Sequence, residues 1–326
     1  MDGLLVVDKP EGPTSHDVVA RMRRVLREKR IGHTGTLDPM ATGVLLLVLG
    51  KATRLATFLT ASDKSYDAVV RLGFATDTAD AQGRAVGPVS DAPMPSREAI
   101  EAALDAFRGT FMQQPPAFSA KKIDGQRSYA LARARAADDA RLKPSRSDGP
   151  AHPALPAPAR VTTTRLEIVN IEADGVTLSL DCSAGFYVRS LAHDLGARLG
   201  VGGHLAALRR TRTGGFGIGQ AIALDAAERD PERAAAAVVP LAGVLRHVPA
   251  LVLTAAGVER VIHGRDIDPR DRSTSEPSAL NSAASSSPMA LSPEPFVRLL
   301  DPHGNLVAIA RPAGTSGLLH PSVVLV

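Results

Sequence analysis

The stretch that decides the fold reads Gly32-His33-Thr34-Gly35-Thr36-Leu37-Asp38-Pro39-Met40-Ala41-Thr42-Gly43, and it runs into the apolar segment Val44–Leu49. Glycines permit backbone conformations that a side chain would block, and Pro39 biases Asp38 toward an extended, non-helical backbone. An Asp-Pro pair between glycines is, on its own, typical of a turn. Because this pair precedes a segment that we expect to be a fully buried strand, the twelve residues predict one carboxylate presented on a shaped loop.

The segment before this loop predicts an amphipathic helix with a basic outer face. Thr14 or Ser15 can cap its start. Apolar side chains recur at helical spacing, at Val18, Val19, Met22, Val25 and Leu26. Positions 21–30 contain one acidic residue, Glu28, and six basic residues, which are Arg21, Arg23, Arg24, Arg27, Lys29 and Arg30. These basic residues could contact phosphates or simply form a solvated helix face. Because they lie directly before the Asp38 loop, phosphate contact is favoured.

The rest of the first 246 residues predicts an α+β domain with a mixed, largely antiparallel sheet flanked by helices. Strands are expected at Leu4–Val7 and Tyr66–Phe74, and residues 161–171 and 176–182 predict a hairpin around Asp174-Gly175. Apolar residues from Val188 to Leu199 then predict a helix with Arg189 in its first turn. Strands, hairpins and helices do not alternate regularly, so a doubly wound sheet is not expected.

The C-terminal residues 247–326 predict a small β-rich domain, because short apolar segments such as Leu251-Val252-Leu253 and Phe296–Leu300 alternate with Gly and Pro turns. Two segments have the composition of mobile insertions. Residues 134–159 are rich in Ala, Pro and charge, and residues 271–295 are dominated by Ser, Pro and Ala without periodicity. We therefore expect domains at 1–246 and 247–326, with a loop inserted in each.

Composition limits the class of protein without naming its function. The chain has 326 residues, 44% hydrophobic residues and a mean hydropathy near zero, as expected of a globular protein. Its longest apolar run is too short to span a membrane, and Met1-Asp2-Gly3 lacks the positive start of a signal peptide. The single cysteine, Cys182, excludes an intrachain disulfide and favours the reducing cytoplasm. The net charge of +4 suits a polyanionic partner.

Five sequence blocks, in order, resemble the bacterial tRNA pseudouridine synthase B family, which isomerises uridine-55 in the T arm of tRNA. The blocks are Lys9–Ser15, the Asp38 loop, Lys64–Asp80, Pro115–Tyr129 and Cys182–Arg189. The resemblance implies a cofactor-free enzyme without a metal. It also implies that the C-terminal domain is similar to a PUA-type RNA-binding barrel. Phe118 and Phe186 depart from the family pattern, where Tyr and a smaller residue are usual, and they remove hydroxyl donors.

The same resemblance implies roles for single residues. Asp38 would be the nucleophile, Arg189 would pair with it and orient it, and Tyr66 would stack on the target base and help to remove the C5 proton. His33 would fill the space left by the flipped base. The other residues implied to bind substrate are Gly35, Lys9, Lys64, Tyr187, Lys122 and Tyr129. Attack on the ribose C1′, addition to the pyrimidine ring and a glycal route all need one ionised carboxylate, and the sequence leaves the three open.

The function expected is therefore isomerisation of uridine-55 by base flipping and an aspartate nucleophile. The expected partner is the tRNA T arm, with no membrane, no obligatory protein partner and a monomeric chain. Two alternatives stay open at this point. One is the catalytic subunit of a guide-RNA-directed pseudouridine synthase, and the other is a tRNA-binding folding factor in which Asp38 has no chemical role.

Overall fold

The computed structural model describes residues 1–116, 122–123, 126–127, 156–273, 296–314 and 317–326. Contacts between Cα atoms divide the chain into two compact units. Unit 1 comprises residues 1–37, 43–62 and 212–326, and unit 2 comprises residues 38–42 and 63–211. Each unit is thus assembled from segments that are distant in the sequence.

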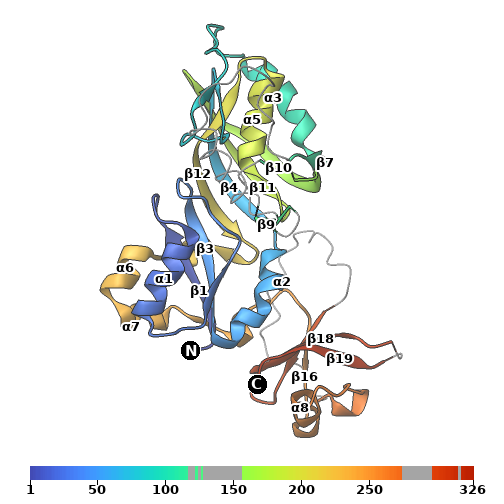
Figure 1. The fold of residues 1–326 in the computed structure, drawn as a ribbon. Coiled ribbons are helices and arrows are strands. Elements are labelled where there is room, and N and C mark those ends of the chain that lie inside the picture. Colours follow the sequence, from blue (N-terminus) through green and yellow to red (C-terminus); the bar gives the residue numbers. More distant parts are fainter. Residues whose placement is uncertain (117–121, 124–125, 128–155, 274–295, 315–316) are drawn as a thin grey trace. The chain divides into compact units, whose positions relative to one another are not determined.

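Unit 1 contains strands of two sheets (Figure 1). In the first, β1 (Gly3–Lys9) pairs antiparallel with β3 (Thr42–Leu49) along its whole length, and β2 (Ile31–Thr34) pairs with the other edge of β3. The segments 216–217, 222–223 and 239–240 form β13, β14 and β15, and β14 runs parallel to β1. The helical segments of the unit before residue 247 are α1 (Ser15–Val25), η1 (Gly50–Leu55), α2 (Ala56–Thr60), η3 (Ile218–Gln220), α6 (Leu224–Arg229), α7 (Pro231–Ala236) and η4 (Leu241–Gly243).

The second sheet of unit 1 is formed by the C-terminal residues. Its strand order is β16 (Ala250–Val252), β17 (Val297–Leu300), β18 (Leu306–Pro312) and β19 (Leu319–Val324). The first pair is parallel and the other two are antiparallel. The helix α8 (Ala255–Ile262) and the turn η5 (Pro269–Asp271) follow β16. These short strands form the β-rich domain that was predicted for this region. The helix α8 was not predicted.

Unit 2 is built on a sheet whose strand order is β12 (Gly203–Thr213), β4 (Lys64–Leu72), β11 (Gly175–Cys182), β10 (Ala159–Glu172) and β7 (Gly109–Gln113). The pairs β4–β11, β11–β10 and β10–β7 are antiparallel. The helices α3 (Arg97–Leu104) and α5 (Val188–Arg198) lie beside this sheet (Figure 1). Its remaining elements are β5 (Ala75–Thr76), β6 (Ala85–Val86), η2 (Asp105–Phe107), β8 (Lys122–Ile123) and β9 (Gln126–Arg127).

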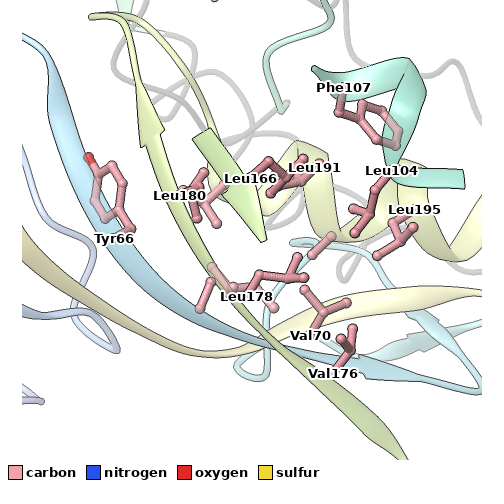
Figure 2. Packing of buried hydrophobic residues seen from close by; sticks show 14 of the residues in the cluster. Tyr66, Val70, Leu104, Phe107, Leu166, Val176, Leu178, Leu180, Leu191 and Leu195 are labelled. Carbon is pink, nitrogen blue, oxygen red and sulfur yellow. The ribbon is translucent and has the colours of Figure 1, made fainter. Parts of the chain in front are cut away.

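The core of unit 2 lies between the sheet and these helices. Figure 2 shows Leu166 from β10, Leu178 and Leu180 from β11 and Leu191 and Leu195 from α5 converging there. These leucines recur at a period of two in the strands and at helical spacing in α5, so each element buries one apolar face. The predicted α+β class, with a largely antiparallel sheet in this unit, is confirmed.

Several expectations from the sequence are confirmed at the level of elements. Thr14 caps α1: its side chain accepts from the Asp17 amide at 3.1 Å, and the Asp17 carboxylate accepts from the Thr14 amide at 2.8 Å. Such a capping box satisfies two amides that a helix leaves unpaired at its start. The hairpin at Asp174-Gly175 joins β10 to β11. Most of the predicted insertions, residues 134–155 and 274–295, lie outside the described residues.

Candidate active site

Asp38 lies in the loop that leads from β2 to β3, and this loop is fixed on both sides of the carboxylate. Before it, the Leu37 amide donates to Ser15 Oγ at 2.9 Å, and Ser15 Oγ donates back to the Leu37 carbonyl at 3.0 Å. After it, the Ala41 amide donates to the Asp38 carbonyl at 3.1 Å and closes a turn. Met40 is buried in the core of unit 2. The Asp-Pro pair therefore forms a turn and at the same time presents a carboxylate.

The partner of this carboxylate is Arg189, in the first turn of α5. Arg189 Nε lies 2.9 Å from Asp38 Oδ2. The Arg189 side chain is 8% exposed, whereas the Asp38 side chain is 38% exposed. A charge-assisted hydrogen bond of this length is strong and directional, so it fixes the orientation of the carboxylate. The carboxylate thus has one side on a buried cation and another side open to an incoming molecule.

Arg189 is itself held by the loop that follows β5. Its Nη1 donates to the Thr78 carbonyl at 3.2 Å and lies 3.8 Å from Asp80 Oδ2. Asp80 is buried and is fixed by two donors to Oδ1, the Thr78 hydroxyl at 2.6 Å and the Gln82 amide at 3.0 Å. A buried guanidinium between two carboxylates is compensated on both sides, which is how proteins retain charge in their interior. The three groups form an ordered Asp38–Arg189–Asp80 row.

Tyr66 lies on β4, at the edge of the hydrophobic cluster in Figure 2. Burial raises the pKa of its phenol; the positive charge of Arg210 opposes this rise, and the charge of Asp38 adds to it. These influences place Arg210 and Asp38 in the surroundings of the ring. Two residues earlier on the same strand, Lys64 is buried beside Cys182, its cross-strand partner. Burial, followed by the charge of Arg210, lowers the pKa of the Lys64 ammonium to about 8.

The other residues expected to bind substrate lie in different surroundings. Tyr187 precedes α5, where its amide and carbonyl both bond to the Gln113 side chain, at 2.8 and 2.9 Å. His33 is half-buried in β2, with Nε2 3.3 Å from Thr36 Oγ1 and its ring edge-on to His16. Gly35 has φ +72°, in the left-handed region that glycine tolerates.

Lys9 and two residues of the fourth sequence block complete the set. Lys9 is fully buried and its ammonium donates to the Pro10 carbonyl at 2.9 Å, so contact with RNA requires the segment after β1 to move. Lys122 lies in the short strand β8, and Tyr129 lies outside the described residues.

Sequence reasoning assigned no role to two buried charges of this site, Asp80 and Arg210. Asp80 lies in the family-like block at 76–80, and the Thr and Asp residues of that block are the sequence feature that could have indicated its role. Arg210 is one of several arginines in β12 and is 1% exposed. No sequence pattern distinguishes it from its neighbours, because burial depends on the strand beside it.

Chemically, the site combines a half-exposed carboxylate, a buried guanidinium that orients it and a tyrosine ring nearby. Such a set suits attack on, or deprotonation of, a flat, electrophilic substrate that stacks on an aromatic ring. Within the described residues, His, Cys, Asp and Glu side chains form no group of three or more that could hold a metal ion. The helices of the described part of the chain are all too short or too polar to cross a membrane.

Comparison with solved structures identifies the fold. The chain is similar over 99% of its length to a protein in the "Structure of H/ACA RNP bound to a substrate RNA containing 2'-deoxyuridine", with a TM-score of 0.69, 24% identity and 85% of that chain covered. It is similar over its whole length to a chain of a Cbf5-Nop10-Gar1 complex, with a TM-score of 0.67, 25% identity and 85% coverage of that chain.

Sequence comparison is more specific. A family model described as "TruB family pseudouridylate synthase (N terminal domain)" matches residues 23–147, and one described as "tRNA pseudouridylate synthase B C-terminal domain" matches residues 189–245. The tRNA pseudouridine synthase B of Solibacter usitatus (strain Ellin6076) is 38% identical over the full length of both chains. That of Mycobacterium avium (strain 104) is 50% identical over 68% of each. The chain therefore belongs to the TruB family of pseudouridylate synthases.

Proposed function

We propose that this protein converts uridine to pseudouridine in tRNA, at position 55 of the T loop, with Asp38 as the nucleophile. The observation that carries the proposal is the ion pair between Asp38 and Arg189, at 2.9 Å, in a chain of the TruB family. The relatives between 38% and 50% identical are named tRNA pseudouridine synthase B, which supports tRNA as the substrate. Their names support a stand-alone enzyme over a guide-directed subunit.

The reaction exchanges one bond of the uridine for another. The bond from N1 of the base to C1′ of the ribose breaks, the base turns, and C5 bonds to C1′. The C5 hydrogen then leaves as a proton and N1 gains one, so the product is an isomer. Asp38 serves as nucleophile or base in each of the three routes, because each needs an ionised carboxylate beside the sugar or ring. Arg189 keeps that carboxylate oriented, which avoids reorganisation during the reaction.

Substrate recognition follows from the place of the target base. A uridine in a folded loop must leave its stack before a carboxylate can reach it, and the flipped base needs an aromatic surface. Tyr66 provides this surface in our proposal and assists removal of the C5 proton. His33 fills the vacated space. Gly35, Lys9, Lys64, Tyr187, Lys122 and Tyr129 contact the RNA, through its backbone and shape rather than base edges.

We extend the proposal to the organisation of the protein. Residues 1–246 carry the chemistry, and residues 247–326 act as a PUA-like module that contacts RNA. The protein works as a monomer without a partner protein, metal or cofactor, in the cytoplasm where its substrate is processed. The basic, half-exposed surfaces of α1 support an RNA ligand.

The test is to map the product on an unmodified tRNA transcript. Purified protein is incubated with the transcript alone, and pseudouridine is located by carbodiimide modification followed by primer extension. We expect one stop, at position 55, and none in a transcript with cytidine there. Conversion only after a guide RNA is added would replace the proposal by the guide-directed function. Accelerated tRNA refolding without any conversion would replace it by the folding factor.

A further inference from the structure

The start of α5, which carries Arg189 in its first turn, is bonded to the end of β7 on both sides of that arginine. Before it, the Gln113 side chain binds both backbone groups of Tyr187: Oε1 accepts from the amide at 2.8 Å, and Nε2 donates to the carbonyl at 2.9 Å. After it, the Ser190 hydroxyl donates to the Gln114 carbonyl at 2.7 Å. Gln113 is the last residue of β7, so one short segment holds the helix at two points.

The Gln113 amide group has one orientation that satisfies its surroundings. Gln113 is 2% exposed, so its oxygen and its nitrogen both need partners within the protein. Turning the amide by half a rotation would place its nitrogen against the Tyr187 amide and its oxygen against the Tyr187 carbonyl. Donor would then meet donor, and acceptor would meet acceptor. Gln113 therefore holds Tyr187 with two hydrogen bonds of fixed direction.

The helix α5 depends on this contact because its own first residue does not cap it. Tyr187 is the N-cap residue, and its side chain makes no capping hydrogen bond. Its carbonyl accepts the first bond of the helix, from the Leu191 amide at 3.2 Å, and the bond from Gln113 as well. Both lone pairs of that carbonyl are thus used. The position of the first helical turn is therefore set from β7.

A contact between two aromatic rings supports the same segment. Phe111 of β7 lies edge-on to Phe186, with ring centroids 6.2 Å apart. Residues two apart on a strand point to the same face, so Phe111 and Gln113 share one face of β7. They meet two consecutive residues of the chain, Phe186 and Tyr187. The strand thus supports the residues before α5 through apolar and polar contacts together.

We propose that Gln113 is a positioning residue that holds the start of α5 where the Arg189 guanidinium meets the Asp38 carboxylate. Arg189 touches the carboxylate itself, with Nε 2.9 Å from Oδ2, whereas Gln113 acts through the backbone two residues earlier. A group displaced by about 1 Å can cost about a hundredfold in rate, so the start of α5 must be held closely. The inference deepens the proposed function, on which it rests for the roles of Asp38 and Arg189. Gln113 lies outside the five sequence blocks, so the resemblance gave it no role.

The first experiment observes the Tyr187 amide in the free protein. The chain has three tyrosines, so labelling with ¹⁵N-tyrosine gives three amide resonances, and Tyr187→Phe removes the one from Tyr187. Gln113→Met keeps the length of the side chain and removes both hydrogen-bonding groups. We expect the Tyr187 amide of this variant to exchange with solvent roughly tenfold faster or more. The Tyr66 amide, inside β4, should keep its wild-type rate.

The matched control is Gln220→Met. Gln220 also accepts from a backbone amide, that of Gly217 at 3.0 Å, but it is exposed and lies in η3. The Tyr187 amide should exchange at the wild-type rate in this control. Wild-type exchange of the Tyr187 amide in folded Gln113→Met would overturn the inference. This outcome involves no tRNA, so it is distinct from failure of the proposed function.

Gln113→Glu restores the two bonds by protonation, and it tests the inference even if Gln113→Met does not fold. An ionised carboxylate accepts from the Tyr187 amide but repels the carbonyl, whereas the protonated acid accepts and donates as the amide does. Burial raises the pKa of a carboxyl, so acidification from about pH 8 to about pH 5.5 should protonate this one. We expect the Tyr187 resonance of Gln113→Glu to move toward its wild-type position as the pH falls. A resonance that is independent of pH would contradict the inference.

The last experiment links the two bonds to the reaction. In single-turnover assays at saturating protein, we expect Gln113→Met to slow conversion roughly ten- to a hundredfold, and Gln220→Met to leave it unchanged. Relative to the wild type at the same pH, the loss in Gln113→Glu should shrink as the pH falls, whereas the loss in Gln113→Met should not. Equal losses in both Gln113 variants at every pH, or a wild-type rate in Gln113→Met, would overturn the inference. Absence of conversion by the wild type would instead overturn the proposed function.

Discussion

At the level of single side chains, the site depends on how one buried guanidinium is held. Arg189 has Asp38 on one side and Asp80 on the other, and the Thr78 carbonyl accepts from it as well. The resemblance predicted Arg189 as the partner of Asp38. Because these residues are far apart in the sequence, their spacing does not indicate that a third residue, Asp80, joins them. The role of Asp80 follows from the structure, in which the loop after β5 contacts Arg189 of α5.

The contact between Asp80 and Arg189 gives a prediction. Asp80→Asn removes the counter-charge but keeps the acceptor of the Thr78 hydroxyl, so the loop should retain its shape. We expect Arg189 to shift and the single-turnover rate to fall by roughly ten- to a hundredfold, the usual effect of a misplaced catalytic group. Asp77→Asn, an exposed position in the same loop, is the control. A wild-type rate in Asp80→Asn would show that the charge of Asp80 is not needed to hold Arg189 in place.

At the level of elements, α5 is fixed against the start of β12 by a contact between backbones. A Cβ added at Gly196 would lie 2.1 Å from the Gly203 amide nitrogen, a distance that only backbone movement can relieve. The glycine therefore sets the close approach of the helix that carries Arg189 in its first turn.

Gly196→Ala should accordingly destabilise the protein by about 1–3 kcal/mol, as overpacking does. Because α5 must move, conversion should slow as well. Thermal denaturation and single-turnover kinetics measure the two effects. Gly219→Ala is the control, since a Cβ there meets no atom within 4 Å. Equal melting temperatures for the two variants would contradict the packing argument.

The basic residues on and after the helix α1 differ in whether they have partners within the protein. Arg23 is exposed yet donates to the Ile31 carbonyl at 2.7 Å, and Arg21 lies 3.7 Å from Glu228, so part of the predicted basic face has internal partners. Glu28, the one acid of the segment, is paired with the N-terminal ammonium at 2.9 Å. Arg24, in the last turn of α1, and Arg27 and Arg30, which follow the helix, remain exposed.

If these three arginines contact phosphates, their replacement by Ser lowers tRNA affinity and its dependence on salt. For every phosphate that the variant no longer neutralises, the slope of log K against log[salt] should fall by roughly 0.7 to 0.9. Filter binding from low to moderate salt measures this slope, with Arg229→Ser, an exposed arginine on α6, as the control. An unchanged slope would show that this face of α1 is only solvated.

Elements with a clear period were predictable from the sequence, and others were not. The strands β1, β3, β4, β10 and β11 and the helices α1 and α5 lie where an apolar run, alternation or helical spacing indicated them. The strand β12 escaped prediction because the run from Leu208 to Thr213 reads as a charged segment, and Arg210 occupies a buried position that an apolar residue would normally fill. The helix α8 is too short to stand out among the turns around it.

At the level of the whole molecule, Lys64 couples stability to pH. Its ammonium is disfavoured by burial and by Arg210, so the pKa falls and the folded protein releases a proton at about pH 8, whereas an unfolded lysine releases it near 10.5. Between these values the unfolded state binds more protons, and the free energy of unfolding rises with pH. Below pH 8 both states carry the charge, and the full penalty of burying it is present.

Lys64→Met removes this penalty while preserving volume. We expect the variant to exceed the wild type in melting temperature at pH 7, and the difference to shrink between pH 8 and pH 10.5. Differential scanning calorimetry across this range measures it, and Lys51→Met, at a partly exposed position, should follow the wild-type curve. A difference that is independent of pH would mean that Lys64 has the same pKa in the folded and the unfolded protein.

The fold class was predictable because it rests on local periodicity, but the grouping of segments was not. Residues 212–326 cluster with residues 1–37 in unit 1, and both Leu4 and Leu300 belong to one hydrophobic cluster. Such contacts join the two ends of the chain and leave no mark in composition. The boundary between residues 246 and 247 rests on the pattern of short apolar segments and turns after it, and it stays a prediction.

The central claim, that Asp38 is the nucleophile of a tRNA uridine isomerase, is tested most directly by tritium release. A tRNA transcript labelled at C5 of uridine is incubated with wild-type protein and with Asp38→Asn, and Asp91→Asn at an exposed position serves as the control. Formation of the bond from C5 to C1′ must expel the label. We predict release by the wild type and by Asp91→Asn, and none by Asp38→Asn, which should still bind tRNA. Release by a verified Asp38→Asn protein would contradict the account.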